Sequence, residues 1–312
     1  MDIKEINSTS FNSQRGSSWL PVVNQPGRAV GILFGVFFIM LILVSLVTAL
    51  LMGQDNTISV KGARILAIVQ DLLVFILPAI LAAFAATRLP ASLLTVNIRP
   101  RLFSIVMAII IMVTSMPTME MLIQWNNDIH FPEALSGLED TLRGMEDAAS
   151  SGISALSGGC SVGDLIVGIL IIGILTGIAE ELFFRGALQN IFMTMPKVKK
   201  HFAIWAVAVI FSFMHFQFFG FIPRVLLGAY FGYLIWWTGS IWVPIIAHAF
   251  NNSLVVLVSW IAVRNGSAEA IDGTASVTIG NDWTTILLSI FVTILGIIIL
   301  RRDALRHRSH PL

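Results

Sequence analysis

The stretch that decides the fold of this chain reads Gly177-Ile-Ala-Glu180-Glu181-Leu-Phe-Phe-Arg185-Gly186. Two neighbouring carboxylates and a guanidinium lie there, in an otherwise strongly apolar segment that begins at residue 163. A charged side chain at the centre of a membrane costs about 2.5 kcal/mol or more. Charges that are retained at such a depth need partners, a chemical role, or both.

The bulk composition indicates a membrane protein. Hydrophobic residues make up 56% of the 312 residues and charged residues 12%, and the mean hydropathy is +0.85. Because a soluble domain carries about 25% charged residues, we expect a polytopic membrane protein. The net charge of +1 gives no indication of a nucleic-acid partner, and no basic stretch alternates with aromatic residues. The single cysteine, Cys160, excludes an intramolecular disulfide.

Eight apolar runs of this sequence are long enough to cross a bilayer, since a spanning helix needs about 20 mostly apolar residues. We therefore predict an all-α fold, a polytopic helical bundle of about eight transmembrane helices. The first run follows a polar tail, residues 1–28, that is too long for a removed signal peptide and lacks its small-residue cleavage site. The predicted spans are residues 29–52, 63–87, 103–123, 163–183, 203–220, 222–238, 241–263 and 283–300.

The charges of the loops predict the orientation in the membrane. Loops 88–101 and 195–202 each carry three basic residues and no acidic one, and the tail 301–312 carries four arginines and one aspartate. Loops 124–162 and 264–282 are acidic. By the positive-inside rule the basic segments and both termini are cytoplasmic, and the acidic loops face outward. The short tails favour a bacterial inner membrane protein.

Residues 124–162 form the one sizeable loop. Leucines spaced with acids between them predict a short amphipathic helix on the outer surface, and the Ser/Gly-rich residues 150–159 predict a flexible linker. We divide the chain into a polar cytoplasmic tail (1–28), three membrane helices with the outer amphipathic loop (29–162), a core that holds the unusual polar residues (163–263), and a last transmembrane helix with a basic cytoplasmic tail (264–312).

The two glutamates have different helical neighbours. Glu181 and Arg185 are four residues apart, in the order that favours an ion pair on a helix, and we interpret them as a buried structural salt bridge. Glu180 is turned by about 100° from Glu181 and has no cation three or four residues away. Apolar surroundings suit such a carboxyl group for general acid or base catalysis near neutral pH.

Two further apolar segments each carry a histidine. Phe211 precedes His215 by four residues, and His248 precedes Asn252 by four, so each pair shares one face of a helix. A single histidine in an apolar helix is usually a hydrogen-bonded core residue. Three polar features on three successive segments are harder to explain in that way. Together they supply a base for water, an imidazole and donors for an oxyanion, which indicates hydrolysis.

Three motifs in this order resemble the CPBP family of membrane proteases. The family comprises the type II CAAX prenyl endopeptidases and Abi-like bacterial relatives linked to bacteriocin processing and self-immunity. The resemblance covers about residues 163–263, a third of the chain. The motifs are Glu180-Glu181-x-x-x-Arg185, Phe211-x-x-x-His215 and His248-x-x-x-Asn252.

The resemblance implies a bundle of about eight helices with a catalytic cavity within helices four to seven. It also implies that Glu180 and His215 activate water, and that His248 and Asn252 stabilise the oxyanion. Glu181, Arg185 and Phe211 are then structural support.

Members of this family are often described as metalloproteases, and the same residues allow two mechanisms. The chain has no His-Glu-x-x-His motif, yet Glu180, His215 and His248 would supply one carboxylate and two imidazoles to a zinc ion. In the metal-free alternative Glu180 is the base and His215 its partner. Both alternatives stay open from the residues alone.

Polar residues outside these motifs have structural interpretations. Asp71 is expected to pair with Arg64 or with a neighbouring helix, and Glu120 to lie at the outer interface. Gln70, Asp71 and Glu120 could also line a substrate cavity. Arg224 is expected to be an interfacial anchor.

We therefore predict an intramembrane endopeptidase that hydrolyses a peptide bond of a membrane-associated protein or peptide. Its expected partners are that substrate and the lipid bilayer. One alternative is a non-proteolytic membrane scaffold or a bacteriocin self-immunity protein, in which the polar core is structural. A proton-coupled transporter is a weaker alternative, because the sequence lacks matched broken helices in two halves.

The positions in the predicted spans suggest where the site lies. Glu180 is 17 residues from Gly163, about 25 Å along a helix, which places it in the cytoplasmic half of a hydrocarbon core of about 30 Å. Counted from the cytoplasmic end of its own span, His248 lies about 10 Å deep, which is comparable with Glu180. His215 lies deeper, near 20 Å from the cytoplasmic end of its span. We expect a water-filled cavity that opens to the cytoplasm and admits a substrate from that side or laterally from the inner leaflet.

Overall fold

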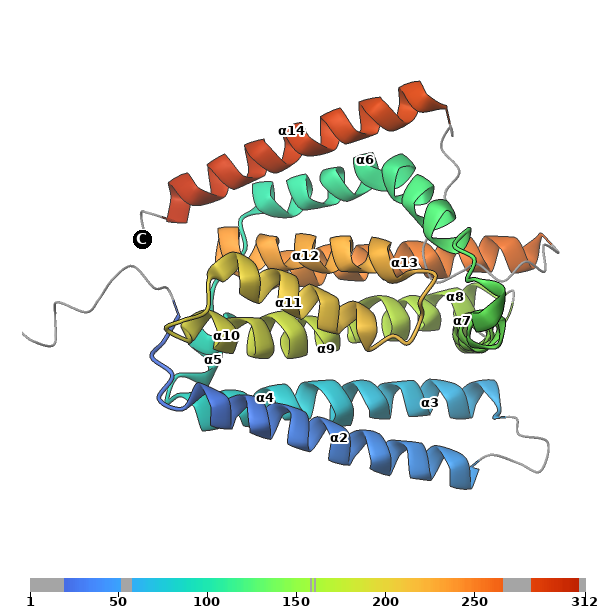
Figure 1. Ribbon diagram of the computed structural model, residues 1–312. Helices are drawn as coiled ribbons and strands as arrows, with labels where there is room; N and C mark the ends of the chain where they lie inside the picture. Colours follow the sequence, from blue (N-terminus) through green and yellow to red (C-terminus); the bar gives the residue numbers. More distant parts are fainter. Residues whose placement is uncertain (1–19, 52–57, 158, 160, 266–281, 309–312) are drawn as a thin grey trace, which may run out of the picture.

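The computed structural model describes residues 20–51, 58–157, 159, 161–265 and 282–308, and the secondary structure of these residues is helical, without a β-strand. The predicted all-α fold is confirmed, and the long helices lie side by side in one bundle (Figure 1). The helices are α2 (Pro26–Leu51), α3 (Val60–Gln70), α4 (Leu77–Ala86), α5 (Pro90–Leu93), α6 (Leu102–Asn127), α7 (Ser136–Ser157), α8 (Val162–Gly168), α9 (Thr176–Glu181), α10 (Asn190–Thr194), α11 (Lys200–Phe213), α12 (Phe221–Thr238), α13 (Trp242–Arg264) and α14 (Trp283–Arg308).

Three π-helical stretches, in which each backbone hydrogen bond spans one more residue than in an α-helix, are continuous with five of these helices. η1 (Asp71–Ile76) joins α3 to α4, η3 (Ile169–Leu175) joins α8 to α9, and η4 (Leu182–Gln189) joins α9 to α10. A short 3₁₀ turn, η2 (Glu133–Leu135), precedes α7. The segment from α8 to α10 is therefore one rod, and it runs well beyond the end predicted for the fourth span.

The protein is a multi-pass membrane protein. Within the described ranges, six helical segments are long and apolar enough to cross a bilayer. Of the remaining two predicted spans, α11 is apolar but has 14 residues, about 21 Å, and α12 is not among the six. The six segments are Pro26–Leu51, Val60–Ala86, Leu102–Asn127, Val162–Thr194, Trp242–Arg264 and Trp283–His307.

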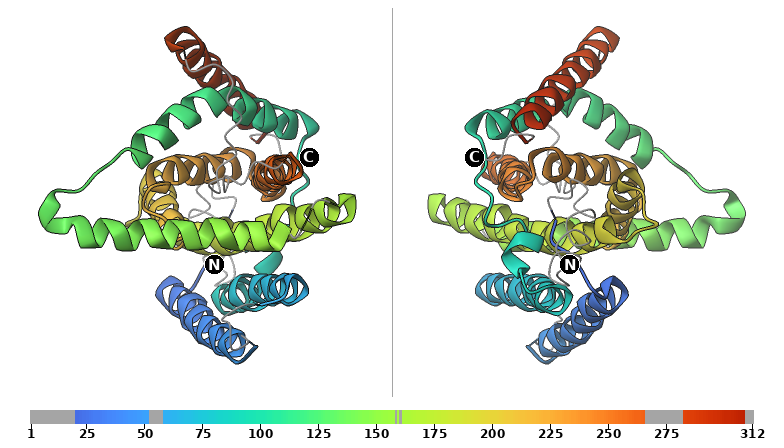
Figure 2. Two further views of the ribbon diagram at one scale, coloured as in Figure 1. Left: turned by 90° about the vertical axis from the view of Figure 1, so that its right-hand side faces the viewer. Right: turned by 90° about the vertical axis from the view of Figure 1, so that its left-hand side faces the viewer.

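The two ends of the bundle differ in charge. α2 begins and α14 ends at the same end, where the α4–α6 and α10–α11 connections also lie (Figure 1). We call this the basic end, because it carries the basic segments 88–101, 195–202 and 301–308. α7 lies across the opposite end, which we call the acidic end (Figure 2). The structure thus groups the basic segments at one end and places residues 136–157 at the other.

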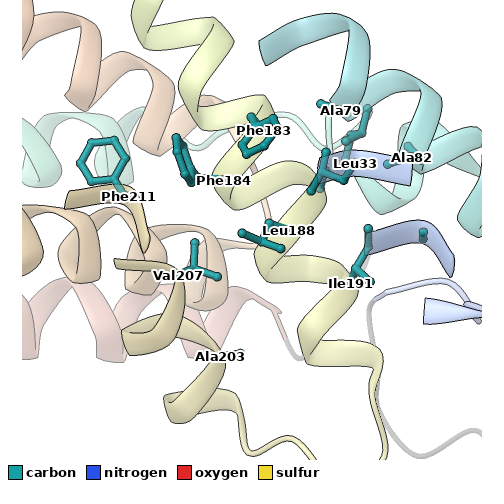
Figure 3. Packing of buried hydrophobic residues seen from close by; sticks show 14 of the residues in the cluster. Leu33, Ala79, Ala82, Phe183, Phe184, Leu188, Ile191, Ala203, Val207 and Phe211 are labelled. Atoms are coloured by element: carbon teal, nitrogen blue, oxygen red, sulfur yellow. The ribbon is translucent and has the colours of Figure 1, made fainter. Parts of the chain in front are cut away.

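The half of the bundle toward the basic end is a packed hydrophobic core (Figure 3). Phe183 is fully buried, and its ring centroid lies 5.3 Å from that of Phe37 and 5.7 Å from that of Phe75. Leu188 and Ile191 continue this core along the same rod, and both are fully buried. Each aromatic pair of this kind stabilises the fold by about 0.5–1.5 kcal/mol beyond the contribution from burying its apolar surface.

Two glycines allow α13 to approach the rod that contains α9. A Cβ atom at Gly177 would lie 3.1 Å from the backbone nitrogen of Ala249, closer than side chains normally pack. Gly173 faces Ser253 of α13 in the same way. Small residues let helix backbones come close in a membrane, where packing rather than the hydrophobic effect holds helices together. The side chains that follow Gly177 can therefore reach α13.

The predicted outer helix is present as α7, but the predicted flexible linker is wrong over residues 150–157, which extend this helix. The sequence reason is that Ile153 and Leu156 continue the apolar spacing of the helix. Residues 158 and 160 of the expected linker lie outside the described ranges. Near the start of α7, the Glu139 carboxylate accepts from the Phe131 backbone N–H and from the Arg143 guanidinium, and these contacts lower the pKa of this carboxyl to about 2.

The orientation yields a first prediction. A reporter fused after Gly159 should lie outside the cytoplasm and a reporter fused at Leu312 inside it, because the basic segments of the chain are retained on the cytoplasmic side. Paired alkaline phosphatase and fluorescent protein fusions measure this directly. Fusions at both points that report the same side would contradict it, since an odd number of spans should separate them.

Candidate active site

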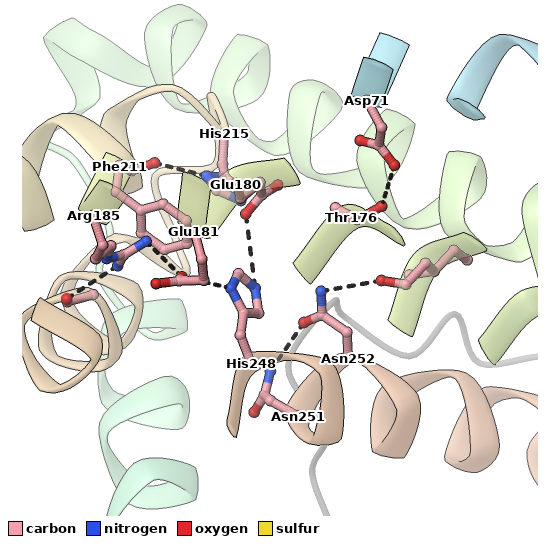
Figure 4. Close-up of polar contacts among 12 residues, drawn as sticks. Asp71, Thr176, Glu180, Glu181, Arg185, Phe211, His215, His248, Asn251 and Asn252 are labelled. Carbon is pink, nitrogen blue, oxygen red and sulfur yellow. Dashed lines mark hydrogen bonds and ion pairs between the residues drawn. The ribbon is translucent and has the colours of Figure 1, made fainter. Parts of the chain in front are cut away.

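The polar residues of α9 meet α13 at one carboxylate oxygen. Oε1 of Glu181 accepts a hydrogen bond from Nη1 of Arg185 at 2.8 Å and another from Nδ1 of His248 at 2.8 Å (Figure 4). Glu181 and Arg185 are both fully buried. The predicted ion pair is therefore present, and it also orients the histidine of another helix.

Arg185 connects this carboxylate to α12. Its Nη2 donates to the backbone carbonyl of Gly228 at 3.0 Å, and its guanidinium lies 4.4 Å from the centroid of the Phe211 ring. An arginine suits such a position because its planar fork donates in several directions and stacks on aromatic faces. These contacts assign Arg185 to the support of the site.

His248 lies between the two glutamates. Its Nδ1 donates to Glu181, because a carboxylate can only accept, and its Nε2 lies 3.7 Å from Oε2 of Glu180. The imidazole stacks on Phe231, with ring centroids 4.9 Å apart. Neighbouring residues on a helix point about 100° apart, so Glu180 and Glu181 approach opposite nitrogens of one ring.

His215 follows the end of α11 rather than lying within a helix. Phe216, the next residue, has a φ of 54°, in the left-handed region. The His215 Nδ1 donates to the carbonyl of Phe211 at 2.7 Å, and the two rings lie 4.8 Å apart. Since a carbonyl only accepts, Nδ1 carries the proton and Nε2 is the available acceptor of the neutral ring.

Asn252 lies one turn beyond His248 on α13. Its Nδ2 donates to the carbonyl of Ile172 in η3 at 3.2 Å, and its Oδ1 accepts from Asn251 at 3.3 Å. A carboxamide has two N–H donors. One of them is used by Ile172, and the second is the one that a substrate oxygen could use.

These side chains share one cavity of about 710 Å³. Glu180, His215, His248 and Asn252 all line it, together with Phe211. Glu181 and Arg185 support it from behind and do not line it within the described ranges. The structure thus brings the four predicted catalytic residues to one space, together with the predicted support Phe211, and keeps the supports Glu181 and Arg185 out of the lining.

The cavity lies between the middle of the bundle and the acidic end. No described residue of the stretches 76–111, 185–210 and 228–247, which make up the half toward the basic end, lines it. The cavity thus lies away from the basic end. The prediction that the basic loops are cytoplasmic therefore conflicts with the prediction that the cavity opens to the cytoplasm. The predicted end of the fourth span near residue 183 is wrong, because the rod continues to Thr194. Glu180 is 14 residues from that end, about 21 Å, which is similar to the depth expected for His215.

Two polar residues of the second span have other partners than expected. Asp71 is buried and accepts from the Thr176 hydroxyl at 2.8 Å, whereas Arg64 pairs with Asp164 at 2.8 Å. The Asp71–Arg64 pair is therefore wrong and the neighbouring-helix alternative is right. Thr176 precedes Glu180 by four residues, and this spacing was the signal that could have identified it. Gln70, Asp71 and Glu120 line the cavity, which was the second possibility for these three residues.

Arg224 is not an interfacial anchor. It is 8% exposed and lines the cavity, and its guanidinium donates to Oε1 of Gln217 at 2.9 Å. Gln217 in turn donates to Glu146 of α7 at 2.9 Å. Sequence reasoning missed this chain of contacts because Gln217 lies in the α11–α12 connection, where no helical spacing relates it to Arg224.

The residues available for a metal ion do not fit one in this arrangement. Within the described ranges, no three His, Cys, Asp or Glu side chains come together as a metal-binding group.

Part of this chain is similar to known proteins. Residues 162–254 match the family described as type II CAAX prenyl endopeptidase Rce1-like. The chain is also similar to the uncharacterized protein YpbD of Bacillus subtilis (strain 168), with 31% identity over 84 residues, which are 26% of this chain and 39% of that protein. No solved structure matches the chain.

The matched range contains all three polar motifs, and it coincides with the rod from α8 to α10, with α11 and α12, and with the first half of α13. The resemblance drawn from the motifs is confirmed: residues 162–254 of this multi-pass membrane protein match the type II CAAX prenyl endopeptidase Rce1-like family, which is consistent with a CPBP membrane protease.

Proposed function

We propose that this protein is an intramembrane endopeptidase that cleaves a membrane-associated peptide or protein with a water molecule activated by Glu180 and His215. The observation that carries the proposal is the approach of Glu180 and His248 to 3.7 Å inside a cavity. A carboxyl group, two imidazoles and a carboxamide there border enough space for a peptide. The family match supports the reaction class.

Activation of water falls to Glu180 and His215. The carboxylate of Glu180 accepts a proton from water while the water oxygen attacks the carbonyl carbon of the scissile peptide bond. Nε2 of His215 accepts a hydrogen bond from the other O–H of the same water, because its Nδ1–H is directed to the Phe211 carbonyl. The hydrogen bond from Nδ1 to this carbonyl fixes the orientation of the imidazole and leaves Nε2 without a proton.

Stabilisation of the oxyanion falls to His248 and Asn252. Since His248 Nδ1 already donates to Glu181, a donor at Nε2 requires the imidazolium form, and Glu181 supplies the counter-charge. Asn252 adds its second N–H. Donors that are positioned before the reaction stabilise a developing negative charge without reorganisation, which is commonly the largest single contribution to catalysis.

Collapse of the tetrahedral intermediate completes the reaction. The protonated Glu180 returns its proton to the leaving nitrogen, the C–N bond breaks, and the oxyanion becomes the carbonyl of the new carboxylic acid. One water is consumed, and one amine and one carboxyl terminus are formed. No step of this scheme requires a metal ion.

The complete bundle in this proposal has about eight transmembrane helices. α11 and α12 are then the two short spans beside the six longer ones. The short α11 supports this arrangement, because a helix of 14 residues ends inside the membrane and leaves His215 at its inner end.

The proposal predicts that Glu180→Gln, His215→Ala and His248→Ala each abolish proteolysis while the protein still inserts in the membrane. Glu180→Gln keeps the shape of the side chain but removes the base. The measurement compares cleavage of membrane-tethered peptides by purified wild type and variants. Glu133→Gln, on the surface before α7, is the matched control and should cleave at the wild-type rate. Full activity of Glu180→Gln would instead favour the scaffold alternative.

Asn252→Ala should retain measurable activity, with kcat lowered by about 10²–10³-fold, the usual effect of removing one oxyanion donor. An effect confined to KM would show that Asn252 binds the substrate and the transition state equally, which is not the role of an oxyanion donor. The inactive His248→Ala is the reference, and the ranking of the two residual rates is the result to be measured. An Asn252→Ala variant as inactive as Glu180→Gln would contradict a role limited to one donor.

Arg185→Ala should reduce the amount of folded protein rather than the specific activity of what remains. The substitution leaves Glu181 buried without its cation, a change that costs about 3–5 kcal/mol for a buried pair. Yield of monodisperse protein after extraction is the measurement, with Arg99→Ala on the exposed basic end as the control. Normal yield with no activity would instead give Arg185 a direct part in the chemistry.

A further inference from the structure

The cavity that holds the proposed catalytic residues reaches one end of the bundle. Thr48 near the end of α2, Ile58 before α3 and Ile123 near the end of α6 all line it. These positions lie at the acidic end, where α7 contributes Gly152 to the lining. The cavity therefore extends from Glu180 to the end of the bundle that α7 crosses (Figure 2).

The opposite direction is closed by packed side chains. Phe75 and Phe184 form the floor of the cavity, with ring centroids 6.3 Å apart, and Phe184 packs edge-on against Phe211 at 5.1 Å. Below this floor lie fully buried Leu188 and Ile191 (Figure 3). Interiors packed in this way leave few voids large enough for water. Within the described ranges, buried side chains therefore lie between Glu180 and the basic end, and those of the stretch 185–210 do not line the cavity.

The charges of the chain then assign sides to these two ends. Lysines and arginines of the α4–α6 and α10–α11 connections and of the end of α14 lie at the closed end. The helix at the open end, α7, carries Glu139, Asp140, Glu146 and Asp147 against Arg143. Basic loops are retained in the cytoplasm, so the open end faces away from it.

We propose that the catalytic cavity is reached from the extracytoplasmic side, and that its substrates are segments presented at the outer face of the membrane. This inference rests on the proposed function for its catalytic part, but the direction of access stands on packing and charge alone. The substrate class is the membrane-proximal part of an exported protein or peptide. Cytoplasmic carboxyl-terminal tails are excluded from this class.

The lining adds the character of the segment that would bind. Met112, Met116 and Met119 of α6 face the cavity, and Met214 joins them from the end of α11. Methionine side chains are flexible and polarisable and adapt to apolar groups of different shape. The segment beside the scissile bond is therefore apolar, with tolerance for its exact side chains.

α7 borders the open end through a specific polar contact. Glu146 is buried and accepts from Gln217, a residue of the cavity wall, at 2.9 Å. Burial of a carboxylate is costly unless it accepts hydrogen bonds, so this contact holds α7 against the wall of the cavity. The outer helix is thereby part of the route to the site rather than a separate surface element.

Cysteine accessibility tests the direction of access. The single native cysteine is first removed as Cys160→Ser, and Ser115→Cys is then placed on the cavity wall of α6. Asp140→Cys on α7 reports the acidic end, and Thr87→Cys, just after α4, reports the basic end. A membrane-impermeant maleimide is applied to right-side-out and to inverted vesicles. Each variant is used only if it elutes as the parent protein does.

We expect Ser115→Cys and Asp140→Cys to be modified in right-side-out vesicles and Thr87→Cys in inverted vesicles. Modification of Ser115→Cys only in inverted vesicles, or in neither preparation, would overturn the inference. The readout does not depend on catalysis. A cavity labelled from the acidic end in a protein without peptidase activity would contradict the proposed function and leave the direction of access standing.

Discussion

The carboxylate of Glu181 is the constraint on which the rest of the site depends. It is fully buried, and one of its oxygens accepts from both Arg185 and His248 at 2.8 Å. Removing such a charge from water is costly, and the cost is offset only when the partners are close and well oriented. Arg185 continues to the Gly228 carbonyl of α12, so the one carboxylate joins the rod of α9, α12 and α13. The imidazole held by this network is the one that faces Glu180.

Close helix packing is what allows this network to form. Gly177 brings α13 to the rod one turn before Glu181, since any larger side chain there would meet the backbone of Ala249. π-helical stretches precede and follow α9, and such stretches are frequent at functional sites because they shift the direction of the side chains that follow. Aromatic residues fill the half toward the basic end, and polar groups with a cavity occupy the other half. The protein is thus divided along its axis into a packed support and an accessible site.

Several features of the site could be predicted from the residues, and others could not. The ion pair of Glu181 and Arg185 followed from their spacing of four residues, because helical neighbours are determined locally. The contact of Glu181 with His248 spans 67 residues of sequence, and no local spacing encodes it. Arg224 was misjudged because its partner Gln217 lies in a connection outside the helices. The position of the cavity was misjudged because the π-helical rod extends to Thr194, whereas hydropathy had suggested an end near residue 183.

The sequence by itself determined that this is an all-helical membrane protein, which of its segments are basic, and which residues carry the family motifs. Those properties depend on composition and on neighbours within one helix, so the local pattern is sufficient. Only the tertiary structure decided that Glu180 and Glu181 approach opposite sides of one imidazole, that Asp71 pairs with Thr176, and that the cavity extends away from the basic end. The physical reason is that these outcomes depend on how closely helices distant in sequence can pack, which is decided by small residues and by the need to pair every buried charge.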